Sequence, residues 1–392
     1  MTMTEISVAS VLEAVRDIVP RLRKNGNEAE DRRWIPDENI DLLEKAGVFQ
    51  MAVPRRFGGL ELPLADQFQV LAEIARGCGS TSWVAVAWVS TAWMATLYPD
   101  RTQEEVFASG SVRISGGFTP TATLTSTDGG YVLNGSWRFN SGCRGAHWDL
   151  LAALLERPGV EPEEVFALVP MSELSIANDW DVYAAIGTGS FTTTAKDVFV
   201  PAHRIANSAE AVMSTTSDRS NTGADGRNYG LITFVMAESV ATYIGMAKGA
   251  YETFVERLPG RGIAYSSWAE QSKHPLTQIT VATAANKIAA AEALSGVFLN
   301  LMQRRADAGE QLSIEERATV RGQCGYAIQL LKEAVEALHN ISGASSIQRA
   351  GPFQRFYRDM EGLSLHGMMT PNINLEVHGR VLLGLDPDTE LL

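Results

Sequence analysis

The order of hydrophobic periodicities along the chain constrains its fold more than any other feature. Up to about residue 110, apolar residues recur at the spacing of amphipathic helices. Short β-prone runs bounded by turn signals follow, and helical periods return from about residue 230. This order predicts a mainly α protein with a central β domain. The three expected domains are an N-terminal helical domain at 1–110, a β domain at 111–215 and a C-terminal helical domain at 216–392.

The C-terminal part contains three long apolar-periodic stretches, at 230–258, 275–307 and 313–342. They predict a helical bundle. Such a bundle commonly buries an outer face against another subunit, so we expect a homo-oligomer, with a homotetramer as the preferred state. The polar segment 207–228, which is poor in apolar side chains, predicts a long loop or linker.

Turn chemistry divides the β region into short strands. The dipeptides Asp128-Gly129 and Asn134-Gly135 each predict a hairpin turn. The apolar run at 164–170 ends in proline and predicts a buried strand.

The composition excludes several classes of function. The formal net charge of −13 argues against a nucleic-acid binder, which would present a basic face. Three sparse cysteines without a C-x-x-C pair predict neither a disulfide framework nor a structural zinc site. The N-terminus lacks a signal-peptide pattern, and no run reaches the ~18 apolar residues of a transmembrane helix. We therefore expect a cytoplasmic protein that binds no membrane, nucleic acid or metal.

Five motifs follow one another in the order typical of one family. They are RRFGGLELP at 55–63, YVLNGSWRFNSG at 131–142, GTGSFTTTAKDVFVP at 187–201, FYRDMEGLSLHG at 356–367 and GRVLLG at 379–384. In this order they resemble segments of acyl-CoA dehydrogenases. The resemblance implies that family's fold, which has an N-terminal helical domain, a middle β-barrel or sandwich domain and a C-terminal four-helix bundle.

The catalytic base of those dehydrogenases is missing from this sequence. The family places a glutamate a few residues after an arginine-aspartate pair, which here is Arg358-Asp359. The glutamate position falls near Gly367, and none of residues 365–368 is a carboxylate. Because removing a proton α to a thioester requires a base at that spot, dehydrogenation of an acyl-CoA is disfavoured.

A second set of motifs is closer to another branch of the same superfamily. CGSTSW at 78–83, ISGGFTP at 114–120, the W-x-F-x-S-G pattern at 137–142 and His366 resemble two-component flavin-dependent monooxygenases. The resemblance implies an oxygenase that takes reduced FMN or FAD from a separate flavin reductase. It implies reaction with O₂, through a C4a-hydroperoxyflavin, to hydroxylate a small organic substrate, preferably aromatic or polycyclic.

The chemistry of this branch assigns roles to individual side chains. The reactive flavin species must be shielded from water, and its N5 proton must be held. Substrate orientation or deprotonation needs a group that titrates near neutrality, which histidine provides. The expected catalytic residues are His366, Ser141 and Asn140. The expected flavin-binding residues are Trp137, Phe139, Ser115, Phe118 and Ser190, with Arg261 and Gln278 reaching the flavin pyrophosphate of a partner subunit. The expected substrate-binding residues are Trp83, Thr91 and Met369.

Departures from the branch leave alternatives open. Its aromatic hydroxylases carry a histidine near the position of Thr91, whereas this chain has none before residue 147. Glu361 replaces a second histidine, and Ile186 replaces an arginine. A non-phenolic substrate therefore stays possible, as does N-hydroxylation of an amine or amino sugar. A dehydrogenase or oxidase would need a displaced base, either Glu238 or Glu376. A non-catalytic scaffold is the remaining alternative.

Several of these residues also have a purely structural interpretation. His366 is equally well a packed histidine, and Arg358 with Asp359 is better read as a structural ion pair than as catalysts. We expect Cys143 to be unreactive, because nothing near it in the sequence would lower its pKa.

Overall fold

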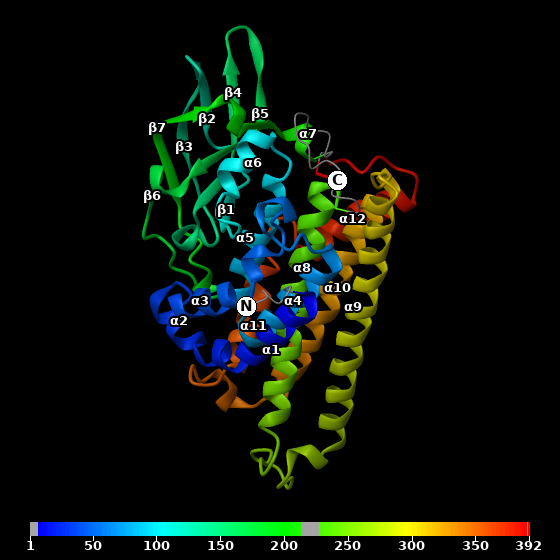
Figure 1. The fold of residues 1–392 in the computed structure, drawn as a ribbon. Helices are drawn as coiled ribbons and strands as arrows, with labels where there is room; N and C mark the ends of the chain where they lie inside the picture. The colour runs from blue at the N-terminus through cyan, green and yellow to red at the C-terminus, as the bar shows by residue number, and fades with distance from the viewer. Residues whose placement is uncertain (1–6, 213–226, 390) are drawn as a thin grey trace.

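The computed structural model describes residues 7–212, 227–389 and 391–392. It consists of an N-terminal group of helices, a sheet formed by the middle of the chain and a long C-terminal bundle, with the sheet at one end of the molecule (Figure 1). The fold class predicted from the sequence is confirmed, since helices precede and follow a single β region.

Four of the six N-terminal helices begin after a proline or at a side-chain cap. Ser7 and Ser10 form a capping box at the start of α1, and Pro36, Pro63 and Pro99 each precede a helix. The central helix α5 is buried along its whole length except at Ala87. The helices are α1 (Val8–Lys24), α2 (Gly26–Arg32), α3 (Asp37–Lys45), α4 (Leu64–Gly77), α5 (Gly79–Ala95) and α6 (Asp100–Val106).

The β region forms one mixed sheet with the strand order β6-β7-β3-β2-β4-β5-β8, and β1 pairs with β4 in parallel. Its inward-facing residues make a hydrophobic core of their own, separate from the helical core. The strands are β1 (Ile114–Gly117), β2 (Thr123–Thr127), β3 (Gly130–Trp137), β4 (Trp148–Arg157), β5 (Val160–Pro170), β6 (Ser175–Ile176), β7 (Thr193–Pro201) and β8 (Ile205–Asn207).

One of the two predicted hairpin turns is wrong. Gly129 turns the chain from β2 into β3 with a φ of 76°, as predicted. Asn134-Gly135, however, lies inside β3, where the pairing register with β7 shifts between Leu133 and Gly135. Asn134 bonds across the sheet to Asp197, with the Asp197 amide 2.8 Å from Asn134 Oδ1. The extra residue of this bulge lies in β7, where Asp197 has a φ of 53°, so the dipeptide faces a bulge instead of ending its own strand.

The C-terminal helices match the predicted stretches closely. The long helices are α8 (Leu231–Glu256), α9 (Pro275–Asp307) and α10 (Ile314–Asn340). Two shorter helices follow them in the chain, α11 (Phe353–Leu363) and α12 (Pro371–Leu382). In the predicted linker, α7 (Ser208–Val212) is a short helix, and residues 213–226 lie outside the described residues.

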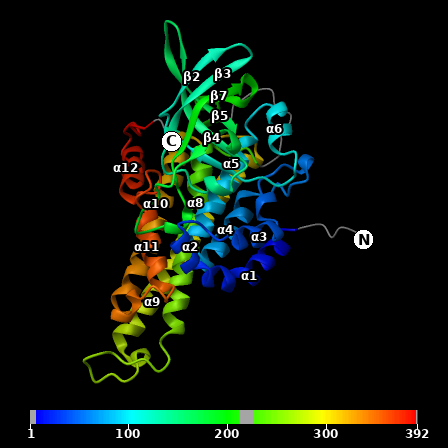
Figure 2. The ribbon, with the colours of Figure 1, turned by 90° about the vertical axis from the view of Figure 1, so that its left-hand side faces the viewer.

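Helix α8 joins the two helical groups. It packs against α4 and α5 on one side and against α10 and α11 on the other (Figure 2). Its length and composition alone would allow it to cross a membrane, but 89% of its most apolar stretch is buried inside the protein. We therefore read α8 as a core helix, and the same core spans N- and C-terminal helices.

Candidate active site

Three segments that are far apart in the sequence meet around the indole of Trp83, on α5. Trp83 Nε1 donates a hydrogen bond to Ser141 Oγ at 3.2 Å, just beyond the end of β3. The imidazole of His366, in the turn after α11, lies 5.5 Å from the indole between ring centroids. Tyr243 of α8 approaches the same indole edge-on, at 6.3 Å. Trp83 thus links the N-terminal helices, the sheet and the C-terminal bundle at one point.

The loop after β3 is held in a defined conformation. Phe139 and Gly142 have φ angles of 61° and 79°, in the left-handed region. The Gly142 carbonyl accepts a hydrogen bond from Trp88 Nε1 at 3.1 Å, and a Cβ at this glycine would lie 2.6 Å from the same nitrogen. Close packing against Trp88 therefore requires glycine here, and it fixes the direction of the neighbouring Ser141.

A row of hydroxyl groups continues from Ser141 into the protein. Ser141 Oγ lies 2.8 Å from Ser190 Oγ, which lies 2.8 Å from Thr188 Oγ1. Thr188 Oγ1 donates to the carbonyl of Ala185, also at 2.8 Å. Ser190 is thus brought next to Ser141, while their roles in flavin binding and catalysis stay predictions.

Two predicted site residues instead bond to a buried carboxyl. Asp149 accepts hydrogen bonds from Ser115 Oγ at 2.9 Å, Asn140 Nδ2 at 2.6 Å and Thr193 Oγ1 at 3.2 Å. Asp149, Ser115 and Asn140 are all fully buried. Burial raises the pKa of Asp149 to about 7, although the three hydrogen bonds act in the opposite direction. The hydroxyl of Ser115 and the amide NH₂ of Asn140 already donate to Asp149. Their expected roles at the flavin stay predictions.

His366 presents one ring nitrogen to its surroundings. Its Nδ1 accepts the Met368 amide proton at 3.3 Å, which places the proton of the neutral ring on Nε2. The residue keeps solvent-exposed surface, yet the protein crowds its ring, and this desolvation lowers the pKa of His366 below its usual value. Beside it, a Cβ at Gly367 would meet no atom within 4 Å, so the position of the missing glutamate is open space.

The predicted aromatic and apolar side chains differ in exposure. Trp137 is buried in the sheet core and donates from Nε1 to the Ala152 carbonyl at 2.8 Å. Phe118 and Phe139 are 46% and 65% exposed, which is unusual for large apolar side chains. The remaining two predicted residues, Thr91 on α5 and Met369 in the turn after α11, are buried.

Arg261 and Gln278 lie away from this cluster. Arg261 follows the end of α8 and Gln278 lies in the first turn of α9. Figure 1 shows this connection between α8 and α9 at the end of the bundle away from the sheet. Arg261 donates to the Ser342 carbonyl and Gln278 to the Ser272 carbonyl. Within one chain neither meets Ser141 or His366, so their predicted role depends on a partner subunit.

The carboxylates considered as displaced bases have different environments. Glu238 on α8 is fully buried, and neither of its oxygens has a hydrogen-bond partner among the described residues. Burial raises the pKa of Glu238 well above its usual value, which favours the protonated carboxyl. Glu376 is largely exposed and pairs with Arg380 on α12.

The predicted ion pair between Arg358 and Asp359 is wrong. Consecutive residues of a helix point in different directions. Arg358 pairs with Glu30, whereas Asp359 accepts the Ala185 amide proton at 2.7 Å. Cys143, predicted to be unreactive, is buried, and burial raises its pKa to about 12.

The sequence reasoning missed four residues of this region. They are Tyr243, Asp149, Thr188 and Thr193. Thr188 belongs to the motif at 187–201, in which only Ser190 was predicted to lie in the site. Tyr243 had no signal beyond helical periodicity, yet its hydroxyl is buried without a hydrogen-bond partner in the described part of the chain.

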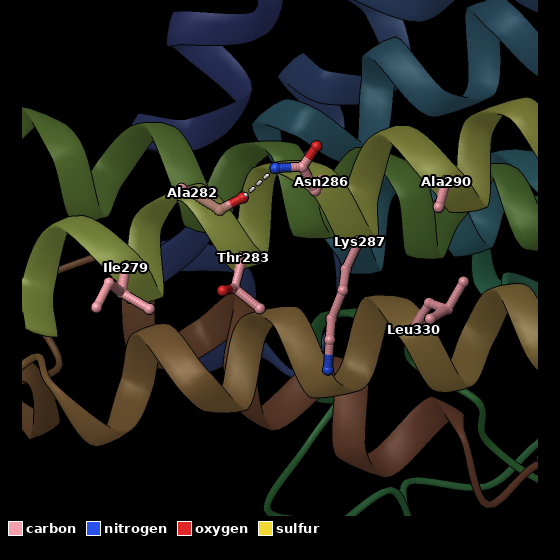
Figure 3. Close-up of a pocket in the computed structure, with 7 residues that line it drawn as sticks. All are labelled: Ile279, Ala282, Thr283, Asn286, Lys287, Ala290 and Leu330. Atoms are coloured by element: carbon pink, nitrogen blue, oxygen red, sulfur yellow. Dashed lines mark hydrogen bonds between the residues drawn. The ribbon is translucent and has the colours of Figure 1, made fainter.

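A separate groove runs between α9 and α10 on the outer side of the bundle (Figure 3). Its walls are mostly small or apolar, and its one charged side chain, Lys287, pairs with Glu333. None of the predicted site residues lines it. The lining residues are Ile279, Ala282, Thr283, Asn286, Lys287, Ala290 and Leu330.

Comparison with known families matches both helical parts of the chain. Residues 8–107 match the model of the acyl-CoA dehydrogenase N-terminal domain, and residues 237–371 match that of the acyl-CoA dehydrogenase C-terminal domain.

Individual relatives resemble nearly the whole chain. The flavin-dependent monooxygenase oxygenase subunit HsaA of Mycobacterium tuberculosis is 32% identical over 96% of both chains, and its crystal structure superposes with a TM-score of 0.91. The oxygenase component of an FADH(2)-dependent resorcinol hydroxylase from Rhizobium sp. is 30% identical, covering 95% of this chain and 94% of that one. XiaF from Streptomyces sp., solved in complex with FADH2 and glycerol, has a TM-score of 0.92 at 26% identity, with 98% of each chain covered.

Proposed function

Because the chain belongs to the acyl-CoA dehydrogenase superfamily, within its branch of flavin-dependent monooxygenase oxygenase subunits, we propose that it hydroxylates an aromatic or polycyclic substrate with reduced flavin and O₂. The observation that carries this proposal is the pairing of Trp83 with both Ser141 and His366, next to open space at Gly367. A thioester dehydrogenase would need a carboxylate in that space.

Three of the predicted side chains would suit a reduced flavin ring. Its flat apolar face matches exposed aromatic side chains, here Phe118 and Phe139, and its polar edge matches the partly exposed hydroxyl of Ser141. These three residues, with Ser190 behind Ser141, would hold the ring. Bound reduced flavin would supply two electrons, so that one oxygen atom of O₂ enters the hydroxylated product and the other leaves as water.

The chain's own groups then have distinct tasks. The neutral ring of His366 offers an N–H at Nε2, which would orient an oxygen of the substrate. The buried walls at Trp83, Thr91 and Met369 would keep water away from the reacting atoms. With Nδ1 already accepting from Met368, we propose orientation rather than proton removal as the main role of His366.

Labelled oxygen tests this function directly. We would mix the purified protein with chemically reduced FAD, ¹⁸O₂ and a panel of phenols and polycyclic ketones, and identify the products by mass spectrometry. We expect one ¹⁸O atom in the product and tighter coupling of flavin oxidation to product with the correct substrate. Anaerobic reduction of bound FAD by an acyl-CoA, without any oxygenated product, would overturn the proposal.

We also propose that the chain works as a homotetramer with a flavin reductase as a separate partner. The exposed apolar face of α9 supports the first part, since Leu276 and Ile279 are 64% and 61% exposed beside the groove of Figure 3. Light scattering of Ile279→Glu should then show smaller species than the wild type. Three buried free cysteines and the core position of α8 support a cytoplasmic location.

A further inference from the structure

Four hydrogen bonds connect Trp83 to the backbone of Ala185 through three hydroxyl groups. The contacts join Trp83 Nε1 to Ser141, Ser141 to Ser190, Ser190 to Thr188, and Thr188 to the Ala185 carbonyl, at 3.2, 2.8, 2.8 and 2.8 Å. The two ends of this hydroxyl row have fixed chemistry. An indole N–H can only donate, and a carbonyl oxygen can only accept.

Counting protons fixes the direction of every bond in the row. Four protons are available, one on the indole and one on each hydroxyl, and there are four contacts to fill. All four contacts are made only if each group donates to the next one towards Ala185. Thr188 therefore donates to the carbonyl, Ser190 donates to Thr188, and Ser141 donates to Ser190.

Ser141 consequently has no proton left for a ligand. Its oxygen accepts from Trp83 and keeps one further lone pair. Ser190 and Thr188 are buried, whereas Ser141 is partly exposed, so the free lone pair belongs to the one member of the row that a ligand can reach. The row presents an acceptor at its outer end.

We propose that this fixed acceptor makes the site select reduced over oxidised flavin, with Ser190 and Thr188 as positioning residues. A reduced flavin ring carries an N–H at N5, whereas the oxidised ring carries a lone pair there. The first would be bound by Ser141 Oγ and the second repelled. This inference rests on the proposed function, because it requires flavin to occupy the site beside Ser141.

Breaking the row at its inner end tests the proposal without measuring catalysis. In Thr188→Val, Ser190 loses its acceptor and can donate to Ser141, so that Ser141 is free to turn its own proton outward. Affinities for oxidised FAD and for dithionite-reduced FAD would be measured anaerobically by fluorescence titration. We expect the ratio of the two dissociation constants to move about tenfold towards oxidised FAD, since a net hydrogen bond is worth roughly one such factor.

Companion variants separate this effect from general damage. Thr188→Ser keeps the hydroxyl and should restore the wild-type ratio, and Ser190→Ala should shift it as Thr188→Val does. Thr253→Val is a matched control, because Thr253 is also buried and donates only to backbone carbonyls, within α8. An unchanged ratio in Thr188→Val, with wild type still preferring reduced FAD, would overturn the inference alone. Failure of the wild type to bind either form would overturn the proposed function.

Discussion

The imidazole of His366 meets the indole of Trp83 edge to face, with ring centroids 5.5 Å apart and planes inclined at 67°. His366 stands on a turn between α11 and α12, and Trp83 on a helix that is buried almost throughout. The contact therefore places a titratable ring from the C-terminal bundle over a rigid N-terminal wall. It also puts His366 on the same indole that donates to Ser141.

Replacing His366 should separate flavin binding from product formation. In His366→Gln we expect reduced FAD to bind as in the wild type, while product formation falls by about a hundredfold, a loss that misplacing a reactant can cause. Hydrogen peroxide should rise as product falls, because flavin oxidation continues without a well-oriented substrate. Product and peroxide would be measured together in single turnovers. A variant such as His203→Gln, which only removes the contact with Glu105, should keep the wild-type yield.

Asp149 should make the stability of the protein depend on pH. The pKa of Asp149 is raised to about 7 in the folded state, from its usual value of 3.8. At a pH between these two values the folded protein still holds a proton that the unfolded chain has released. This contribution to the free energy of unfolding is present below pH 4 and is lost as pH rises to 7. In Asp149→Asn the contribution should be absent. The free energy of unfolding, measured with urea, should decline less from pH 5 to pH 8 in the variant than in the wild type, by on the order of a few kcal/mol. Parallel pH profiles would contradict this role.

Gly142 should tolerate alanine much less well than Gly129 does. Both glycines have positive φ, 79° and 76°, so the backbone cost of alanine is similar. Only at Gly142 does a new Cβ meet Trp88, whereas nothing lies within 4 Å of Gly129. We expect Gly142→Ala to lose about 1–3 kcal/mol more stability than Gly129→Ala, the usual cost of overpacking. Equal unfolding free energies would show that the loop relaxes freely.

Glu238 should be dispensable for oxygenation. A buried carboxyl without hydrogen bonds costs stability, so Glu238→Leu is expected to raise the free energy of unfolding by about 1–3 kcal/mol. Product yield in that variant should remain close to the wild type, because burial raises the pKa of Glu238 and favours the protonated acid, which is a poor base. Loss of flavin reduction by an acyl-CoA in Glu238→Leu, with such reduction in the wild type, would instead identify it as the displaced base.

The sequence predicted helices better than it predicted hydrogen bonds. Long periodic stretches fix helices because every turn contributes an apolar residue, and α9 begins and ends where the pattern does, at Pro275 and Asp307. Asn134-Gly135 carries the same signal as a hairpin turn. Here it instead faces a bulge in β7 at Asp197, 63 residues away, and local rules do not include such a partner.

The same limit applies to the site. The motifs predicted site roles for Trp83, Ser141, Ser190 and His366. In the structure, Trp83 is hydrogen-bonded to Ser141 and Ser141 to Ser190, and His366 packs against Trp83. The motifs did not predict that Ser115 and Asn140 bond to Asp149, because Asp149 lies outside all of the motifs. A preference for one side of a strand can be read from periodicity, whereas a choice between two buried partners depends on three-dimensional packing.

The position of Arg261 and Gln278 at the tip of the α8–α9 hairpin has a consequence for any assay. If they grip the pyrophosphate of a neighbouring copy, as expected, the cofactor is held by two molecules at once. The apparent affinity for flavin would then weaken when the protein is diluted, and the protein concentration at which it weakens would depend on the strength of self-association. Assays at nanomolar protein would underestimate the affinity of the assembled enzyme for flavin.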